Sequence, residues 1–434
     1  MNDQTFVHGT SAAILAGLVL LVGCGRTGLG PFPDDEVADG GLEVGEFPDD
    51  DDDSNDDGRS FVDDDEPPMD PAPPLDPTCG NGVIDPGELC LLPQEIYWSR
   101  IDPCAIDVAD IDGDGHLDVV TPNSDFEHAE SPNNYTSVLY GDGTGRLSEP
   151  VPYESGDDIP VGVRIGDLDN DGLLDFVVAN SDAGTLSIML NAGGREIYNA
   201  ERIPSGNVPI IADLADINGD GVLDLAVSAE NEVRVSLGLG SGRFDIPTSY
   251  ELPGQQWEVR LVDFSHDGHV DMIVSRVSEA AVLLYQGNGT GRFEQTGRID
   301  MPSSTYGIAE GYIDGDGEFD LALAHAVGVS VMEGDFGQFS EAAVLEAGEG
   351  PRDTALADFD MDGRMDAAVL ASGSNDVTLS VAQQGQFNFE MRGVYAVGEQ
   401  PSGIAAGDFN EDGVPDLAIA NQLSNNIGLI LSNP

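Results

Sequence analysis

One nine-residue pattern recurs seven times in the last three quarters of the sequence. The pattern is Asp-x-Asp/Asn-x-Asp-Gly-x-x-Asp. Its copies span Asp110–Asp118, Asp167–Asp175, Asp216–Asp224, Asp263–Asp271, Tyr312–Asp320, Asp358–Asp366 and Asp408–Asp416. Successive copies start 46 to 57 residues apart. This period is typical of a repeat that forms one four-stranded propeller blade.

The spacing of the acidic residues indicates a calcium site in each copy. Carboxylates at positions 1, 3 and 5 converge only where the backbone curls, and the glycine at position 6 of every copy permits that turn. The carbonyl of position 7 and the Asp at position 9 complete the six or more oxygens that Ca²⁺ prefers, whereas an all-protein cage dehydrates Mg²⁺ reluctantly. Since the carboxylates repel one another without a cation, calcium should stabilise the fold.

The predicted ligands fall into seven sets, in which position 7 contributes its backbone carbonyl. They are Asp110, Asp112, Asp114, His116 and Asp118; Asp167, Asp169, Asp171, Leu173 and Asp175; Asp216, Asn218, Asp220, Val222 and Asp224; Asp263, Ser265, Asp267, His269 and Asp271; Asp314, Asp316, Glu318 and Asp320; Asp358, Asp360, Asp362, Arg364 and Asp366; and Asp408, Asn410, Asp412, Val414 and Asp416.

Two copies depart from the pattern. Copy four has Ser265 at position 3, which is a weaker ligand than a carboxylate, and copy five has Tyr312 at position 1, which removes a carboxylate. We therefore expect five complete calcium sites, a weaker fourth site and an incomplete fifth site. Position 2 is apolar in every copy, which predicts that each loop is anchored in the core. This regularity favours metal sites over the alternative of solvated acidic turns.

The residues around each copy predict four strands per repeat. A short β-rich run follows each nonapeptide, and a second strand such as Leu186–Leu190 or Val282–Tyr285 leads into a glycine-rich hairpin. A third strand and a loop lead to the strand that enters the next nonapeptide. The residue just before the nonapeptide is small in six of the seven copies, as the crowded innermost strand of a propeller requires.

These nonapeptides, together with hairpins such as Gly287-Asn288-Gly289-Thr290-Gly291-Arg292-Phe293, resemble the FG-GAP/VCBS repeat of the integrin α-subunit propeller and of exported bacterial proteins. The resemblance covers about residues 95–434. It implies an all-β, seven-bladed propeller of four-stranded blades, with calcium held between the first and second strands of a blade. The last repeat ends after its third strand, Ile427–Leu431, so we expect Glu95–Ile101 to supply the missing outer strand and close the ring.

In this family the face opposite the calcium loops binds ligands. Trp257, Tyr306 and Arg352 each stand six residues before a nonapeptide, where consecutive inner strands begin. The resemblance therefore implies a ligand-binding sector on that face, and two aromatic rings with a guanidinium suit a sugar or an acidic peptide. The alternative is that these side chains plug the central channel. An insertion, Thr121 to Tyr135, should project on the same face.

The N-terminal residues predict export and lipid anchoring. Residues 12–22 form an apolar run of the length of a secretory signal, too short to span a bilayer. The run ends in Leu21-Val22-Gly23-Cys24, which resembles the lipobox of bacterial lipoproteins. Residues 1–24 are thus predicted to be a lipoprotein signal with Cys24 lipidated, placing the chain at the outer membrane or cell surface of a Gram-negative bacterium. The alternative is an ordinary cleaved signal.

Three further segments follow the signal. Residues 25–78 are acidic and proline-rich, which predicts a disordered tether. Residues 79–103 form a short cysteine-containing segment that contributes the closing strand, and residues 104–434 form the propeller. In an exported protein a disulfide is expected among Cys79, Cys90 and Cys104, either between Cys79 and Cys90 or between Cys90 and Cys104.

Composition and motifs narrow the function. With 81 acidic and 16 basic residues the net charge is −65, which excludes a nucleic-acid binder. No serine-nucleophile, zinc-protease or phosphate-loop motif is present, so we do not expect an enzyme. The prediction is a surface-anchored, calcium-binding propeller that acts as a binding or adhesion module for a cell-surface glycan or protein. The alternatives are a carbohydrate-active enzyme, as a polysaccharide lyase or hydrolase, and a structural cell-envelope protein.

Overall fold

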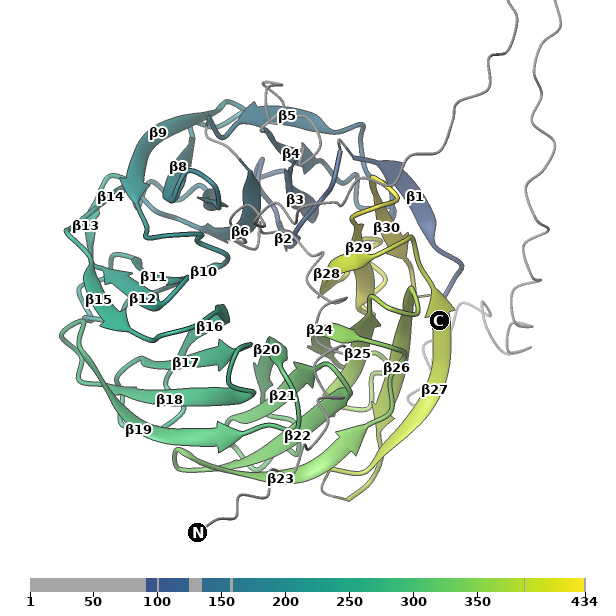
Figure 1. The fold of residues 1–434 in the computed structure, drawn as a ribbon. Coiled ribbons are helices and arrows are strands. Elements are labelled where there is room, and N and C mark those ends of the chain that lie inside the picture. The colour runs from purple at the N-terminus through teal and green to yellow at the C-terminus, as the bar shows by residue number, and fades with distance from the viewer. Residues whose placement is uncertain (1–90, 100, 125–134, 157–158, 386, 433–434) are drawn as a thin grey trace, which may run out of the picture. The chain divides into compact units, whose positions relative to one another are not determined.

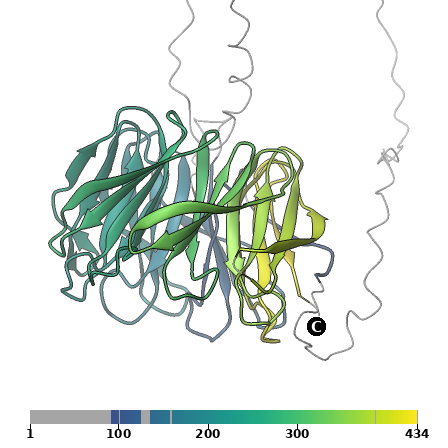
Figure 2. The ribbon, with the colours of Figure 1, turned by 90° about the horizontal axis from the view of Figure 1, so that it is seen from below.

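The computed structural model describes residues 91–99, 101–124, 135–156, 159–385 and 387–432. These residues form seven four-stranded antiparallel sheets, which are arranged as blades around a central axis (Figure 1). Figure 2 shows the same blades from the side, with twisted sheets. The all-β, seven-bladed propeller predicted from the repeat is confirmed. None of the described residues belongs to a helix that could cross a membrane.

Each blade runs from an inner strand at the axis to an outer strand at the rim. The inner strands are β2 (Asp107–Ala109), β6 (Pro160–Gly166), β10 (Ala212–Ala215), β16 (Gln256–Val262), β20 (Thr305–Gly311), β24 (Pro351–Ala357) and β28 (Pro401–Gly407). The second strands are β3 (Asp118–Asn123), β7 (Asp175–Asn180), β11 (Asp224–Ala229), β17 (Asp271–Arg276), β21 (Asp320–His325), β25 (Asp366–Ala371) and β29 (Asp416–Asn421). Every nonapeptide therefore connects an inner strand to a second strand.

The remaining strands complete the blades. The third strands are β4 (Tyr135–Leu139), β8 (Thr185–Asn191), β12 (Glu232–Ser236), β18 (Ala281–Gly287), β22 (Gly328–Asp335), β26 (Asp376–Ala382) and β30 (Asn426–Ile430). The outer strands are β5 (Val151–Glu154), β9 (Ile197–Pro204), β15 (Thr248–Glu251), β19 (Phe293–Asp300), β23 (Gln338–Leu345), β27 (Phe389–Ala396) and β1 (Glu95–Trp98). A small ribbon of β13 (Gly238–Gly240) and β14 (Arg243–Phe244) extends blade three.

The two ends of the repeat array meet in blade seven. Strand β1 pairs antiparallel with β30, from Glu95 opposite Leu429 to Trp98 opposite Asn426. A bridge between Leu91 and Ser432 extends the pairing. The predicted closing strand is therefore present over Glu95–Trp98, and it gives the seventh blade its outer strand without leaving an open edge.

The core lies between the blades. The second strands are buried along their whole length, because each is covered on both faces by neighbouring blades. One cluster, for example, joins Val119 and Leu139 of blade one to Phe409, Ala418 and Leu429 of blade seven. Full burial of such a side chain contributes about 1.5–3 kcal/mol. Burial on two faces explains why these strands read as apolar runs rather than as alternating patterns.

Several predicted features lie outside the described residues. They are the signal segment with Cys24, the acidic segment 25–78, Cys79 and Cys90, and most of the insertion after β3.

Candidate metal sites and axial recess

The nonapeptide loops share one backbone conformation. The glycine at position 6 has a positive φ in all seven copies, between 83° in Gly221 and 97° in Gly115. This confirms the turn expected of that glycine. Position 4 is left-handed as well, with φ between 56° and 76°, although only three copies have glycine there. The left-handed conformation of position 4 was not predicted from the sequence. The glycines at this position in three copies, Gly113, Gly219 and Gly315, could have indicated it.

The Asp at position 9 anchors the loop to its blade. Asp175 is fully buried. Its Oδ2 accepts the N–H of Leu168 at 2.9 Å, and its Oδ1 accepts the N–H of Asn191, at the end of the third strand, at 2.8 Å. All seven copies repeat this arrangement, in which one oxygen accepts the N–H of position 2 or 3 and the other accepts an N–H of the third strand or of the second residue after it.

Burial changes the acidity of these carboxyl groups. It raises the pKa of Asp118, Asp175, Asp224, Asp320 and Asp416 to about 6, although the backbone hydrogen bonds oppose the shift. The pKa of Asp366 is raised to about 7 for the same reason. A carboxylate in this position is therefore costly to keep ionised unless a cation lies beside it.

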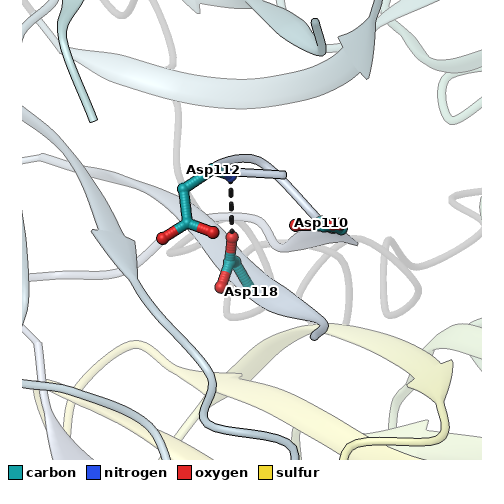
Figure 3. Close-up of side chains that lie close together, drawn as sticks. All are labelled: Asp110, Asp112 and Asp118. Carbon is teal, nitrogen blue, oxygen red and sulfur yellow. Dashed lines mark hydrogen bonds between the residues drawn. The ribbon is translucent and has the colours of Figure 1, made fainter. Parts of the chain in front are cut away.

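Three loops bring three carboxylates together. The groups are Asp110, Asp112 and Asp118; Asp167, Asp169 and Asp175; and Asp358, Asp360 and Asp366. In each group, one ligand atom per residue lies within 4.8 Å of the others. Figure 3 shows the first group, with Asp112 and Asp118 joined by a hydrogen bond from the Asp112 backbone N–H. These are positions 1, 3 and 9 of copies one, two and six, all of which were predicted to be complete.

The donor set of these groups fits a calcium ion. All the side-chain donors are carboxylate oxygens, the hard ligands that calcium prefers. In copy six, Asp360 is 3% exposed and its Oδ1 has no hydrogen-bond partner. A buried carboxylate oxygen without a partner is costly, and a bound cation would remove the cost. The position 5 carboxylates are not part of these groups, so their role as ligands stays a prediction, as does that of the position 7 carbonyls.

Among the described residues, the other four loops bring no such group of three acidic side chains together, although copies three and seven were predicted to be complete. Copies three and seven have Asn218 and Asn410 at position 3, so they hold fewer carboxylates. In copy four, Gln286 Nε2 donates to Asp267 Oδ2 at 2.9 Å and to Ser265 Oγ at 3.3 Å. An amide of the chain thus occupies oxygens that were predicted to bind the cation.

Copy five replaces its first carboxylate with an aromatic contact. The ring of Tyr312 lies against that of Phe319, with centroids 4.6 Å apart. Tyr312 is 46% exposed, and among the described residues the acidic side chains of this loop form no group of three clustered ligands.

Side chains from the loops also connect neighbouring blades. Glu411 at position 4 of copy seven lies 2.5 Å from Nδ1 of His116 at position 7 of copy one. His266 of copy four approaches Glu318 of copy five in the same way, at 3.5 Å. The Glu411 carboxylate raises the pKa of His116 above its ordinary value. Arg195 from blade two reaches Asp112 of copy one at 2.6 Å, so a guanidinium already contacts one predicted ligand.

The predicted ligand-binding residues meet at the axis. Trp257 and Tyr306 form an edge-to-face pair with ring centroids 5.6 Å apart, and the Arg352 guanidinium carbon lies 4.6 Å from the centroid of Trp257. Trp257 and Arg352 line a recess of about 150 Å³ in the channel, together with residues of the inner strands. Tyr306 supports Trp257 and is not among the lining residues.

A layer of alternating charges crosses the same channel. The residues three positions before the nonapeptides are Asp107, Arg164, Asp213 and Arg260 in blades one to four. Arg164 lies 4.0 Å from Asp107 and 3.1 Å from Asp213. Blades five, six and seven have alanine at this position. The sequence analysis did not predict this layer. The signal for it was the alternation of acidic and basic residues at the same position of four successive repeats.

The acidic members of the channel also join adjacent inner strands. Asp213 Oδ2 accepts the N–H of Leu261 at 2.7 Å, and Glu258 Oε2 accepts the N–H of Ile308 at 2.6 Å. Each bond links one blade to the next. Charge-assisted bonds of this kind contribute about 1.5–3 kcal/mol where they are shielded from water.

One of the three predicted disulfide cysteines lies in the described residues. Cys104 is 5% exposed and disulfide-bonded. Its partner lies outside the described residues. The expected pairing of Cys104 with Cys90 stays a prediction.

Comparisons with known proteins agree with this architecture. The FG-GAP-like repeat model matches residues 167–227, 216–274, 263–323 and 358–419, together just over half of the chain. No curated protein matches the sequence. Among solved structures, BBS1N in complex with ARL6DN is 14% identical, with 79% of this chain and 96% of that chain covered and a TM-score of 0.54. Catalytically inactive virginiamycin B lyase from Staphylococcus aureus with quinupristin is 14% identical, with 79% and 99% covered and a TM-score of 0.51. At these identities the two structures show the propeller fold alone.

Proposed function

Because this chain belongs to the FG-GAP-like repeat family, we propose that it is a calcium-binding propeller that presents a ligand site at its axial channel. The observation that carries this proposal is the recess lined by Trp257 and Arg352, a concave site with an aromatic ring and a cation. The ligand would be a cell-surface glycan or protein. The calcium loops would hold the blades rigid around that site.

Calcium would act on stability rather than on a reaction. The carboxylates at positions 1, 3 and 9 would hold the ion, and its charge would offset the repulsion among them and the cost of burying position 9. We expect the melting temperature to fall when calcium is chelated with EGTA and to recover on addition of excess CaCl₂. An unchanged melting curve would contradict the calcium part of the proposal.

A pair of substitutions tests individual loops. Asp167 belongs to a three-carboxylate group, whereas Ser265 lies in the loop whose oxygens contact Gln286. Asp167→Ala should therefore reduce the calcium-dependent rise in melting temperature more than Ser265→Ala does. Calorimetric titration of the two variants should show one fewer strong site only for Asp167→Ala. Equal losses in the two variants would argue against the assignment.

Ligand binding is best tested on arrays. The calcium-loaded protein should bind a restricted set of glycans or peptides, and Trp257→Ala should lose that binding while keeping its melting temperature within a few degrees. If the protein binds no ligand on either array, the role of a structural envelope protein is favoured instead.

We also propose that the protein is exported and anchored through a lipid on Cys24. The disulfide at Cys104 supports an oxidising compartment, because such bonds rarely persist in the cytosol. Metabolic labelling with an alkynyl fatty acid should label the wild-type chain and not Cys24→Ser. Labelling of both chains, or of neither, would contradict the anchor.

The propeller fold by itself does not separate a binding protein from an enzyme, since virginiamycin B lyase shares it. A bound polysaccharide should be recovered intact after incubation with the protein. Release of unsaturated or reducing sugar would favour the carbohydrate-active alternative.

A further inference from the structure

Arg352 differs from the other arginines of the channel in having no acidic partner. Arg164 pairs with Asp213, and Arg260 pairs with Glu258 at 2.6 Å and with Glu310 at 3.6 Å. Among the described residues, no carboxylate lies within ion-pair distance of Arg352. Its Nε is buried without a hydrogen-bond partner, and its guanidinium stacks on Trp257.

Burial lowers the pKa of both Arg352 and Arg260, but only Arg260 has carboxylates that outweigh this effect. The pKa of Arg352 therefore lies below its ordinary value, whereas the carboxylates around Arg260 raise the pKa of that residue. An unpaired guanidinium that is partly removed from water is costly, and the cost is unexpected in a chain with 81 acidic residues and 16 basic ones.

The nearby carboxylates are already used by the backbone. Asp353 Oδ1 accepts the N–H of Thr354 at 2.8 Å, and its Oδ2 accepts the N–H of Ile404 at 3.2 Å. Glu258 accepts the N–H of Ile308 and pairs with Arg260. Turning either carboxylate towards Arg352 would break a bond that links two blades. The described part of the chain therefore offers no free anion for this guanidinium.

We propose that Arg352 and Trp257 bind a single carboxylate group of a small sugar acid in the axial recess. The guanidinium would form charge-assisted hydrogen bonds to the carboxylate, and Trp257 would contact the apolar face of the sugar ring. This inference rests on the proposed ligand site and adds the chemical class of its ligand.

Size and charge both favour a small monovalent acid. The recess has a volume of about 150 Å³, roughly ten times the volume that a cavity needs to hold one water molecule. It can therefore admit one small organic molecule. A polyanion would meet the repulsion of a molecule with a net charge of −65, whereas one carboxylate on a neutral ring meets the least. An acidic peptide carries several charges and is therefore the less favoured ligand.

Tryptophan fluorescence can report on this site alone. The chain has two tryptophans, and Trp98 is 67% exposed on β1. In the Trp98→Phe variant, Trp257 is the sole emitter and lies against Arg352. The calcium-loaded variant is titrated with D-glucuronate and with D-glucuronamide, which has the same shape without the charge. We expect a saturable change with glucuronate and at least about tenfold weaker binding of the amide.

Substitutions of Arg352 complete the experiment. In the Trp98→Phe background, Arg352→Gln should weaken glucuronate binding by about tenfold or more, and Arg352→Lys should lie between the two because it keeps the charge and loses the planar fork. The matched control is Arg298→Gln, which removes an arginine of the outer strand β19 that pairs with Glu279 and Asp300. This control should bind glucuronate like the parent. If Arg352→Gln fails to fold, the comparison of glucuronate with glucuronamide decides alone.

Four outcomes would overturn the inference. Equal binding of glucuronate and glucuronamide would show that the site does not recognise the carboxylate, while the proposed ligand site at Trp257 would remain supported. A response to an acetylated glutamate peptide but not to glucuronate would replace the sugar acid with a peptide. No response to any probe, in a protein that still binds ligands on an array, would remove the carboxylate site and leave the proposed function. Empty arrays as well would remove both.

Discussion

The same carboxylate chemistry serves two purposes in each nonapeptide. Position 1 carboxylates bind the N–H groups of their own loop, as Asp110 does with Gly113 and Asp114 at 2.8 and 3.0 Å. Position 9 carboxylates join the loop to the third strand. These hydrogen bonds shape the loops, and calcium would bind within a turn that they also hold.

The position 9 carboxyl groups predict how stability depends on pH. Burial raises the pKa of five of them, Asp118, Asp175, Asp224, Asp320 and Asp416, to about 6, above the value near 4 of an unfolded chain. The folded, metal-free protein therefore holds extra protons between about pH 4 and pH 6, so its stability rises as the pH falls through that range. The melting temperature of metal-stripped protein should be higher at pH 5 than at pH 7. Calcium should stabilise the protein less at pH 5, because protons compete for the same oxygens.

Differential scanning calorimetry of metal-free and calcium-loaded samples checks both statements. A metal-free melting temperature that drops between pH 7 and pH 5 would contradict the role of burial.

Gly141, which follows the third strand of blade one, lies close to the backbone of the nonapeptide loop, so substituting it should destabilise the protein. A Cβ on Gly141 would lie 2.2 Å from the backbone oxygen of Leu117, whereas a Cβ on Gly328 would make only ordinary contacts. Gly141→Ala should lower the free energy of unfolding by about 1–3 kcal/mol. Gly328→Ala should be neutral or stabilising by about 0.5 kcal/mol, because it restricts the unfolded chain. Urea denaturation of the two variants in calcium measures the difference, and equal effects would refute the close approach.

At the scale of the element, strand β1 determines whether the ring closes. It lies far from β30 in sequence, and its pairing brings residues 95–98 against 426–429. Tyr97 is partly buried and packs against the apolar cluster shared by blades one and seven, while Trp98 is exposed. Most of the strand's contribution should therefore come from backbone pairing and from Tyr97.

Disrupting this strand should loosen the seventh blade first. Tyr97→Pro removes a backbone donor and a partly buried ring, so it should lower the melting temperature and speed amide exchange in β1 and β30 before other blades. Trp98→Ala is the control, and it should change stability by less than about 0.5 kcal/mol. Exchange that rises equally in all seven blades would mean that the ring opens as one unit rather than at its closing strand.

At the scale of the whole molecule, charge is the dominant feature. All 16 basic residues are arginine, and the chain has no lysine. Several of these arginines bridge blades, as Arg164 and Arg195 do, because a planar guanidinium can bind two acceptors at once. The remaining negative charge opposes the compact state through self-repulsion.

Salt should therefore stabilise the metal-free protein. Between about 0.01 M and 1 M sodium chloride the Debye length falls from about 30 Å to about 3 Å, which screens repulsion among exposed carboxylates. The melting temperature should rise over that range. About 1 mM calcium should raise it further than sodium chloride of the same ionic strength does, because calcium binds in the loops rather than screening them. Equal effects at equal ionic strength would indicate screening alone.

Much of the fold of this protein could be predicted from local patterns in the sequence. The repeat specified seven blades, the glycine at position 6 specified the loop turn, and the incomplete last repeat specified a closing strand near Glu95–Trp98. These features depend on residues close together in the chain or on a period, so they can be recognised in one sequence.

The tertiary structure decided which side chains meet across the axis. Trp257 of blade four contacts Arg352 of blade six, and Arg164 lies between Asp107 and Asp213 of the blades on either side. The sequence held these residues at fixed registers, but their pairing depends on the curvature of a closed ring and on which acids the backbone already uses. Whether a charge is paired or left alone at the axis is therefore a property of the assembled ring, because its neighbours come from separate repeats.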